Sequence, residues 1–499
     1  MSLVRCTWRR WTALVLMLAS GFAGLGYQII WTQQTSLWLG HEAAAVLAVV
    51  AAFFGGLAVG GLILGSRIEH SARPMRWYAG CELVIALWSV VLLFVWSPFS
   101  AWMHRATGVE PSPVWHWSLA FCGTVLLFLP ATAAMGATLP AMERLSARMY
   151  GERSSLAALY AGNTLGALLG VLAAAFWLIA AVGLARSAAL CIALNLICAV
   201  TAWAVFRRTE QSASSQSRRA VPAAQHADRA RAGGVVWRLA FTGFLGIGYE
   251  VVVVRVLSQV TENTFYTFAT LLAAYLIGSA AGAAAYQRWL AGRSAVDGLS
   301  DRLLALLAAA CLAGTLSLWA AQSVKSWALD AFGAGVEAAI AAEGLLALLA
   351  FGPATLVMGA LFNHLCRAAS AAGVSVGHAL GINLVGAALA PAVCGVLAVF
   401  LIGPKFVLLA IVLGYLIVTS RQAWFTRRVW VLGSAALAVA LFAPPLSFID
   451  VPEGGRVVSY EDGVTASVSV VEDASGVARL HINNRVQEGS SATPFVDAR

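Results

Sequence analysis

The chain has 499 residues, of which 60% are hydrophobic and only 11% are charged. An ordinary soluble domain has roughly 25% charged residues, so this composition and the mean hydropathy of +0.80 exclude a soluble globular protein, a disordered chain and a coiled coil. The net charge of +9 comes mainly from arginines in short clusters between apolar runs, as membrane topology requires, so nucleic acid is not an expected partner. The composition predicts a membrane protein with many spans, whose main surroundings are the lipid bilayer.

A membrane-spanning helix needs about 20 apolar residues. Thirteen runs approach this length, and the last two are short and separated only by a basic connection. The first run follows three arginines, but it is too long for a secretory signal peptide and is expected to be retained. The predicted spans are 11–39, 43–66, 77–98, 114–140, 155–182, 185–206, 236–260, 265–287, 303–323, 338–362, 374–402, 405–420 and 429–445.

Arginine and lysine residues gather in every second connection between these runs. With the N-terminus in the cytoplasm, the inward connections hold 23 of the 32 basic residues, whereas the outward loops hold only Arg105, Arg186, Lys325 and Lys405. The positive-inside rule therefore predicts a membrane protein with a cytoplasmic N-terminus. Thirteen spans place the tail in the periplasm, and twelve would return it to the cytoplasm.

The sequence repeats itself at an offset of about 222 residues. GFAGLGYQII at 21–30 corresponds to GFLGIGYEVV at 243–252, and AGNTLGALLG at 161–170 corresponds to LGINLVGAAL at 380–389. Each half contains six spans, an even number, so both halves cross the bilayer in the same direction as a parallel repeat. The fold class is therefore an all-α polytopic membrane protein of two parallel six-helix repeats.

The repeat also defines the expected domains. A GxxxG step in each half predicts close packing between helix backbones. The predicted units are a first six-helix repeat at 1–206, a basic cytoplasmic linker at 207–235, a second six-helix repeat at 236–420, a thirteenth helix at 421–445 and a tail at 446–499.

Two charged residues stand out within the predicted spans, Glu250 and Arg255. Ionised groups in hydrocarbon are costly and usually pair or line a cavity. Five residues on a helix place them about 140° apart, so a direct pair would need a bend or a third group. One interpretation is a polar substrate site between the halves, with Tyr27 and Tyr249 nearby. The other is a structural tie between the repeats, in which Gln28 occupies the position that matches Glu250.

Asn163 and Asn383 occupy matched positions in the two repeats. A buried asparagine commonly donates a hydrogen bond to a neighbouring helix, so a structural role is favoured for both. The eight cysteines lie in or beside apolar segments without a CxxC pair, so they predict packing and no metal site.

From Gly454 the character of the sequence changes. Apolar and polar residues alternate, with many β-branched side chains and turn signals at 461–463, 473–476 and 483–484. This pattern predicts a small antiparallel β element of about three strands at the C-terminus.

The chain resembles bacterial membrane proteins in which a multi-span region is fused to a spermidine-synthase-like domain. The segments that carry the resemblance are GLGYQIIWTQQ at 24–34, LPATAAMGATLP at 129–140, LYAGNTLGALLG at 159–170, GIGYEVVVVRVLS at 246–258 and the tail at 459–487. The tail is similar to the N-terminal hairpin region of aminopropyltransferases, which implies that Gln487 borders a substrate site. The family's Asp-Gly before that glutamine is Asn483-Asn484 here.

The resemblance implies a polyamine or other amine substrate, with decarboxylated S-adenosylmethionine as co-substrate. The Rossmann-like catalytic core and its glycine-rich loop would follow the hairpin, and they are missing from these residues. No cofactor is therefore expected within this chain, and catalysis by these residues alone is not expected.

Three functions follow from these observations. The first is a spermidine-synthase-like membrane protein whose spans anchor, and supply substrate to, a catalytic domain that is absent or incomplete here. The second is a transporter of a small polar or amine solute between the two halves, since the plan also resembles the major facilitator superfamily in outline. The third is a membrane scaffold, acting as a homodimer or with a separate soluble partner.

Overall fold

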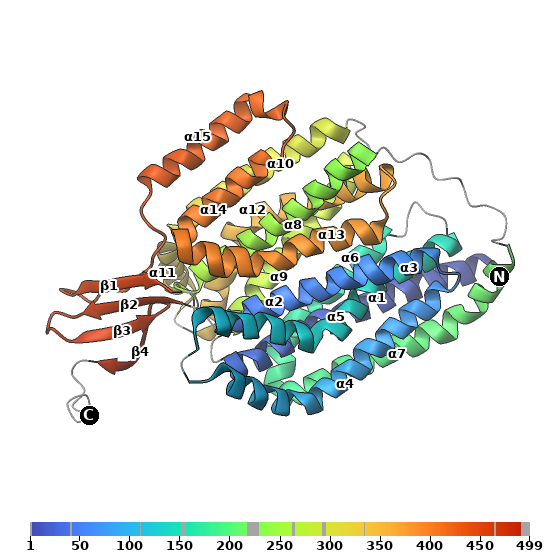
Figure 1. Ribbon diagram of the computed structural model, residues 1–499, viewed down its shortest axis with the longest axis horizontal. Helices are drawn as coiled ribbons and strands as arrows, with labels where there is room; N and C mark the ends of the chain where they lie inside the picture. The colour runs from blue at the N-terminus through green and yellow to red at the C-terminus, as the bar shows by residue number, and fades with distance from the viewer. Residues whose placement is uncertain are drawn as a thin grey trace.

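A computed structural model gives the fold of the protein (Figure 1). It describes residues 2–39, 42–109, 111–150, 156–216, 229–261, 265–291, 296–333, 335–463 and 466–490. The middle of the predicted linker, 217–228, lies outside the described residues, and the flanking parts of 207–235 belong to α7 and α8.

Long helices make up both halves of the described chain. The first half contains α1 (Ser2–Leu39), α2 (Glu42–Val59), α3 (Gly65–His70), α4 (Pro74–Thr107), α5 (Pro113–Tyr150), α6 (Leu156–Ala173) and α7 (Ile179–Gln216). The second half contains α8 (Arg229–Leu257), α9 (Phe265–Ala285), α10 (Val296–Leu318), α11 (Ala321–Phe332), α12 (Val336–Ala371), α13 (Val376–Ala390) and α14 (Val399–Ile417), and α15 (Arg427–Phe442) follows. Short π-helical segments at Gly60–Leu64, Ala174–Leu178, Tyr286–Leu290 and Pro391–Ala398 continue the helices that they adjoin.

The described residues include ten helical stretches that are long and apolar enough to cross a membrane. Two of them, Ala158–Arg207 and Val376–Ile417, are 50 and 42 residues long, more than twice the length that one crossing needs (about 20 residues). Each bends at a glycine with positive φ, Gly183 at 80° and Gly403 at 76°, a conformation that side chains disfavour. The predicted total of twelve to thirteen spans is confirmed, because these two stretches contain two crossings each.

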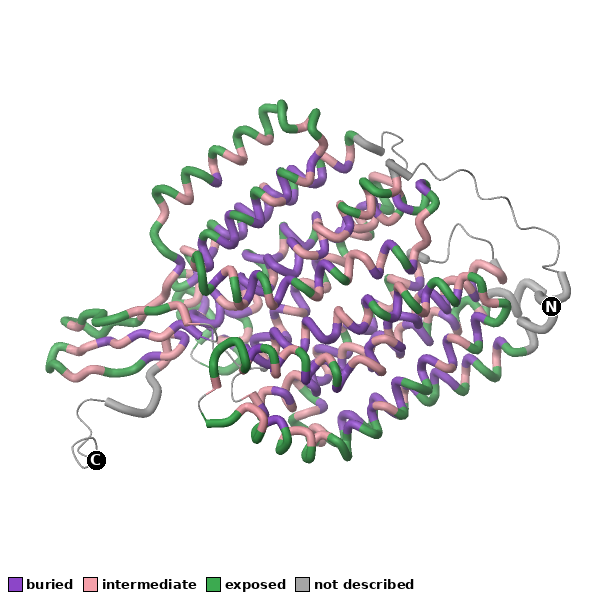
Figure 2. Tube along the Cα trace, in the orientation of Figure 1, coloured by how far each residue is buried: buried purple, intermediate pink, exposed green. Residues whose placement is uncertain are grey.

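The thirteenth predicted span is α15, which has only 16 residues. It packs against α10 and α14 at the outside of the bundle (Figure 1). Its outer residues are exposed (Figure 2), as in a helix that meets lipid on one side.

The two halves use matching glycine contacts within themselves. A Cβ atom on Gly21 would lie 2.1 Å from the carbonyl oxygen of Asn163, and one on Gly243 would lie 2.0 Å from that of Asn383. Because no side chain fits into such a gap, these glycines allow the helix backbones to touch. The same pairing recurs between α2 and α5 in the first half and between α9 and α12 in the second. The predicted parallel repeat is therefore present in the packing as well as in the sequence.

The halves meet along two helix pairs that are repeat counterparts, α2 with α13 and α9 with α6. Apolar side chains fill both contacts, including Leu47 with Ala387 in one and Val171 with Ala269 in the other. Buried residues lie on facing helices and exposed residues on the outer edges (Figure 2). Among these outer residues Phe94 is 76% exposed and Trp177 is 67% exposed, so the outer surface suits hydrocarbon.

The tail forms a four-stranded antiparallel sheet in the order β1 (Arg456–Asp462), β2 (Ser467–Glu472), β3 (Ala478–Ile482) and β4 (Arg485–Ser490). The prediction of about three strands therefore missed one. Asn483 and Asn484 both have positive φ (49° and 61°), which makes a two-residue hairpin turn and starts the fourth strand. The sheet and the N-terminal end of α1 lie at opposite ends of the bundle (Figure 1).

The sheet is attached to the end of α8. Nη1 of Arg255 donates a hydrogen bond to Gly395 O over 3.0 Å, and Nη2 donates to Gly463 O in the connection between β1 and β2. Arg485 of β4 donates to Thr261 O over 2.8 Å. Two contacts therefore hold the sheet at the C-terminal end of α8, one from the connection between β1 and β2 and one from β4.

A candidate solute site between the two halves

A cavity of about 310 Å³ lies between the halves. Its walls come from α1, α2, α5 and α6 and from their repeat counterparts α8, α9, α12 and α13. Its volume is at the lower end of the range of small-molecule sites, roughly 300–1,000 Å³. The cavity is therefore large enough for a compact organic solute.

The residues that line the cavity occur in pairs related by the repeat. Apart from Leu307, every lining residue has its counterpart from the other half in the wall, at offsets of 220 to 223 residues. Representative pairs are Gly24 with Gly246, Gln28 with Glu250, Phe53 with Tyr275, Leu57 with Ser279, Met135 with Met358 and Asn163 with Asn383. The cavity thus lies on the axis that relates the two repeats.

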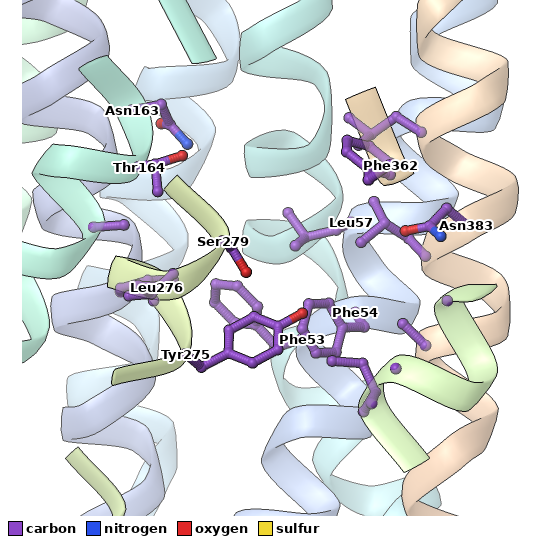
Figure 3. A pocket seen from close by; sticks show the side chains of 18 of the residues that line it. Phe53, Phe54, Leu57, Asn163, Thr164, Tyr275, Leu276, Ser279, Phe362 and Asn383 are labelled. Carbon is purple, nitrogen blue, oxygen red and sulfur yellow. The ribbon is translucent and has the colours of Figure 1, made fainter. Parts of the chain in front are cut away.

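Most of the wall is apolar, with polar groups at a few positions. Tyr275 extends into the cavity beside Phe53 and Phe54, and Ser279 points its hydroxyl group inward one turn further along α9 (Figure 3). Asn163 and Asn383 lie on opposite sides (Figure 3). None of the described residues that line the cavity is a lysine, arginine or histidine.

Glu250 is the only acidic residue among the described residues of the wall. It lies on α8 one turn after Gly246, which also lines the cavity. No hydrogen bond or ion pair joins its carboxyl group to any described residue. A buried carboxylate without a partner is costly, so this group needs either a proton or a cationic ligand.

The matched asparagines also hold helices together. Nδ2 of Asn383 donates a hydrogen bond to Leu239 O over 2.9 Å, which joins α13 to α8. Asn163 joins α6 to α1 by a different contact, in which its backbone packs closely against Gly21. Both side chains line the cavity, so a structural contact and a lining position coincide at these residues.

The other predicted site residues lie away from the cavity. Tyr249 is fully buried and donates to Ala350 O over 2.9 Å, and Tyr27 is fully buried and stacks on Trp31 at 5.1 Å between ring centroids. Each directly precedes a lining residue, and one residue turns a helix by about 100°, so both face the interior of their own half. Arg255 binds the sheet, as described above, and is not brought together with Glu250.

Gln487 lies in β4, and its side chain is outside the described part of the structure. The structure therefore brings Glu250, Gln28, Asn163 and Asn383 together, and it places Tyr27, Tyr249 and Arg255 elsewhere.

Sequence reasoning missed the lining residues of α2 and α9, Phe53, Tyr275 and Ser279. The signal that could have found them is the matched GxxxG step. Phe53 and Tyr275 each stand three residues before the first glycine of the step, at Gly56 and Gly278. On a helix this spacing places them beside the glycine contact, one turn away.

No protein-family model matches the chain. No curated protein matches it either. A crystal structure of a bacterial homologue of the human lysosomal transporter Spinster, in an inward-facing and occupied conformation, has a TM-score of 0.41 and 13% sequence identity; the match covers 87% of this chain and 96% of that one.

These findings correct the resemblance to the spermidine-synthase-like membrane family. The solved structure that the comparison reports is a transporter homologue, not an aminopropyltransferase, and no family model supports the resemblance. The tail motifs misled because short alternating strands with polar turns occur in many unrelated proteins. The function implied by that resemblance, an anchor for an aminopropyltransferase-like domain, is wrong as well. The function proposed next rests on the geometry of the cavity.

Proposed function

We propose that the protein is a transporter whose substrate is a small organic cation with an apolar body, such as a substituted amine. The observation that carries this proposal is the unpartnered carboxyl group of Glu250 in a cavity on the repeat axis. A cation placed there would replace the counter-charge that the protein does not supply.

The remaining wall suits the apolar part of such a solute. Phe53, Phe54, Tyr275 and Phe362 offer aromatic rings, whose faces attract cations, and the absence of lysine, arginine and histidine from the described wall avoids repulsion. Two methionines, Met135 and Met358, add flexible, polarisable surface that adapts to different shapes.

The packing supports movement of one half against the other. Within each half, a Cβ on Gly21 or Gly243 would lie only 2.1 or 2.0 Å from a backbone oxygen. The glycines that meet between the halves pack less tightly, since a Cβ on Gly61 would lie 3.2 Å from Gly377 O, and apolar side chains make further contacts there. Rigid halves that rock about a central site are the usual basis of alternating access in transporters built from repeats.

The test compares two solutes of nearly equal shape, benzyltrimethylammonium and its uncharged carbon analogue neopentylbenzene. Purified protein should bind the cation and, in proteoliposomes, carry it across the membrane, whereas the uncharged analogue should bind at least about tenfold more weakly because it cannot pair with Glu250. Equal binding of both compounds, or binding of the cation without flux, would contradict the proposal.

We also propose that the N-terminus is cytoplasmic and the sheet periplasmic, in a bacterial inner membrane. In a Cys122→Ser background, Ala474→Cys in the exposed turn of the sheet should react with a membrane-impermeant maleimide in intact cells. Arg73→Cys, exposed in the connection at the other end of the bundle, should react only after the membrane is opened. The reverse labelling pattern would invert the orientation.

A further inference from the structure

A second buried acid, Glu82, lies inside the first half and outside the cavity wall. It is on α4, its exposed fraction is 0%, and Nδ2 of Asn195 on α7 donates a hydrogen bond to its Oε2 over 2.7 Å. The hydroxyl groups of Ser20 on α1 and Tyr78 on α4 lie beside the same carboxyl group. The carboxyl group is therefore enclosed among three helices, α1, α4 and α7.

Two atoms in this cluster have no partner among the described residues. They are Oε1 of Glu82 and Oδ1 of Asn195, both fully enclosed. Both are hydrogen-bond acceptors, and they belong to side chains that one hydrogen bond already joins. A proton on Oε1 turns that oxygen into a donor, which can close the paired ring that a carboxylic acid forms with an amide.

Among the described residues, no cationic side chain compensates Glu82. The titratable groups that influence it or are influenced by it are Tyr27 on α1, Tyr78 and Cys81 on α4, and Cys198 on α7, and all of them are neutral at ordinary pH. From α3 and α5, which also pack against α4, the described residues add no charged group that acts on this carboxyl. An ionised Glu82 therefore stands without a counter-charge.

One residue beside Glu82 also belongs to the cavity wall. Ser20 lies beside Glu82 and also lines the cavity. The same helix, α1, holds Leu16, whose carbonyl oxygen accepts a hydrogen bond from Tyr78 over 3.3 Å. A change in the charge of Glu82 thus acts on a helix that forms part of the cavity wall.

The repeat makes this acid specific to one half. At offsets of 222 and 220 residues, the positions of Glu82 and Asn195 are occupied by Leu304 and Tyr415. Conversely, Glu250 in the second half has the uncharged Gln28 as its counterpart in the first. The cavity acid Glu250 and the acid behind the wall, Glu82, therefore each occur in one half only.

We propose that Glu82, with Asn195 and Ser20, is a proton-binding site whose occupancy is coupled to the solute in the cavity. This rests on the proposed transport function and names its coupling ion. The proton is bound at Oε1 when the cavity is empty. A cation in the cavity favours the ionised carboxylate, so the proton leaves as the cation binds and the two exchange.

The proton site itself can be tested without any solute. Infrared difference spectra of the purified full-length protein at neutral pH should contain the carbonyl stretch of a protonated carboxyl group that disappears in Glu82→Gln. If this variant does not fold, Glu82→Asp should shift the same band. A spectrum from which neither variant removes nor shifts such a band overturns the proposal, whatever the protein transports.

The coupling needs a second measurement, the number of protons released per benzyltrimethylammonium bound. This permanent cation carries no proton of its own. Glu82→Gln should release one proton fewer than the wild type when it binds the cation. For each pH unit, the factor by which its affinity for the cation rises should be about ten times smaller than the factor for the wild type. The control Glu343→Gln removes another buried acid, which accepts from Thr267 outside the cavity wall, and should match the wild type.

These outcomes separate the two proposals. Failure of the wild-type protein to bind the cation contradicts the transport function, while the infrared result still decides whether Glu82 holds a proton. Equal proton release by wild type and Glu82→Gln, or affinity that depends on sodium concentration and not on pH, overturns the coupling.

Discussion

Replacing Glu250 by glutamine is expected to weaken the binding of benzyltrimethylammonium by about two orders of magnitude. Two opposite charges about 4 Å apart interact with about 4 kcal/mol at the effective dielectric constant of a partly buried site, and a loss of about 2.7 kcal/mol already gives a hundredfold change in affinity. Glutamine keeps the shape of the side chain, so affinity for neopentylbenzene should stay unchanged. Isothermal titration of both compounds against purified protein gives the two values.

The repeat supplies a matched variant for this prediction. Gln28 lines the cavity at the position that corresponds to Glu250. In the double variant Gln28→Glu/Glu250→Gln the carboxyl group moves to the other half but remains at the same cavity, so affinity for the cation should recover to within about tenfold of the wild type. If the double variant binds as weakly as Glu250→Gln, the two positions do not share one site on the repeat axis.

Adding a single methyl group at Gly282 is expected to be among the most damaging changes in the molecule. The Cβ of Gly282→Ala would lie 1.8 Å from the carbonyl oxygen of Leu356 and 3.1 Å from the amide nitrogen of Ala360, both backbone atoms of α12. Neither can rotate away, so α9 and α12 must separate. Overpacking of this kind costs about 3 kcal/mol or more. Thermal unfolding of the purified variant should show a clearly lower midpoint than the wild type.

Gly80 is the control for that substitution. It lies within α4, and a Cβ there would meet nothing within 4 Å. Alanine favours a helix over glycine by about 1 kcal/mol, so Gly80→Ala should leave the unfolding midpoint unchanged or raise it. A similar midpoint for Gly282→Ala and Gly80→Ala would show that the close contact between α9 and α12 is not needed for stability.

Much of the helical plan could be predicted from composition and repetition. Long apolar runs are sufficient to locate spans, and Gly183 and Gly403 lie at the predicted boundaries between neighbouring spans. Internal repetition predicted two halves with matching contacts, since the same residues recur at Gly21 and Gly243. The turn at 483–484 was predicted, but the fourth strand after it was harder to foresee, because Val486 is the one apolar residue in 485–490 and no alternating pattern marks the segment.

The candidate site could be predicted only in part. A charge inside an apolar run is conspicuous, so Glu250 was found, whereas Phe53 and Tyr275 are indistinguishable from lipid-facing or core aromatics without the packing of α2 and α9. Arg255 is equally conspicuous but has a different partner. Its guanidinium group reaches backbone oxygens of Gly395 and Gly463, and Gly463 is 208 residues away in sequence, a contact that no local pattern encodes.

The attachment of the sheet to α8 links the aqueous end of the molecule to the cavity. Arg255 stands five residues after Glu250 on the same helix, so any rotation or tilt of that helix must be shared by the sheet or must break the bonds to Gly463 and Thr261. For the proposed transport function, an antibody fragment that binds the sheet should therefore slow solute flux, and a fluorophore placed on the sheet should report movements of α8.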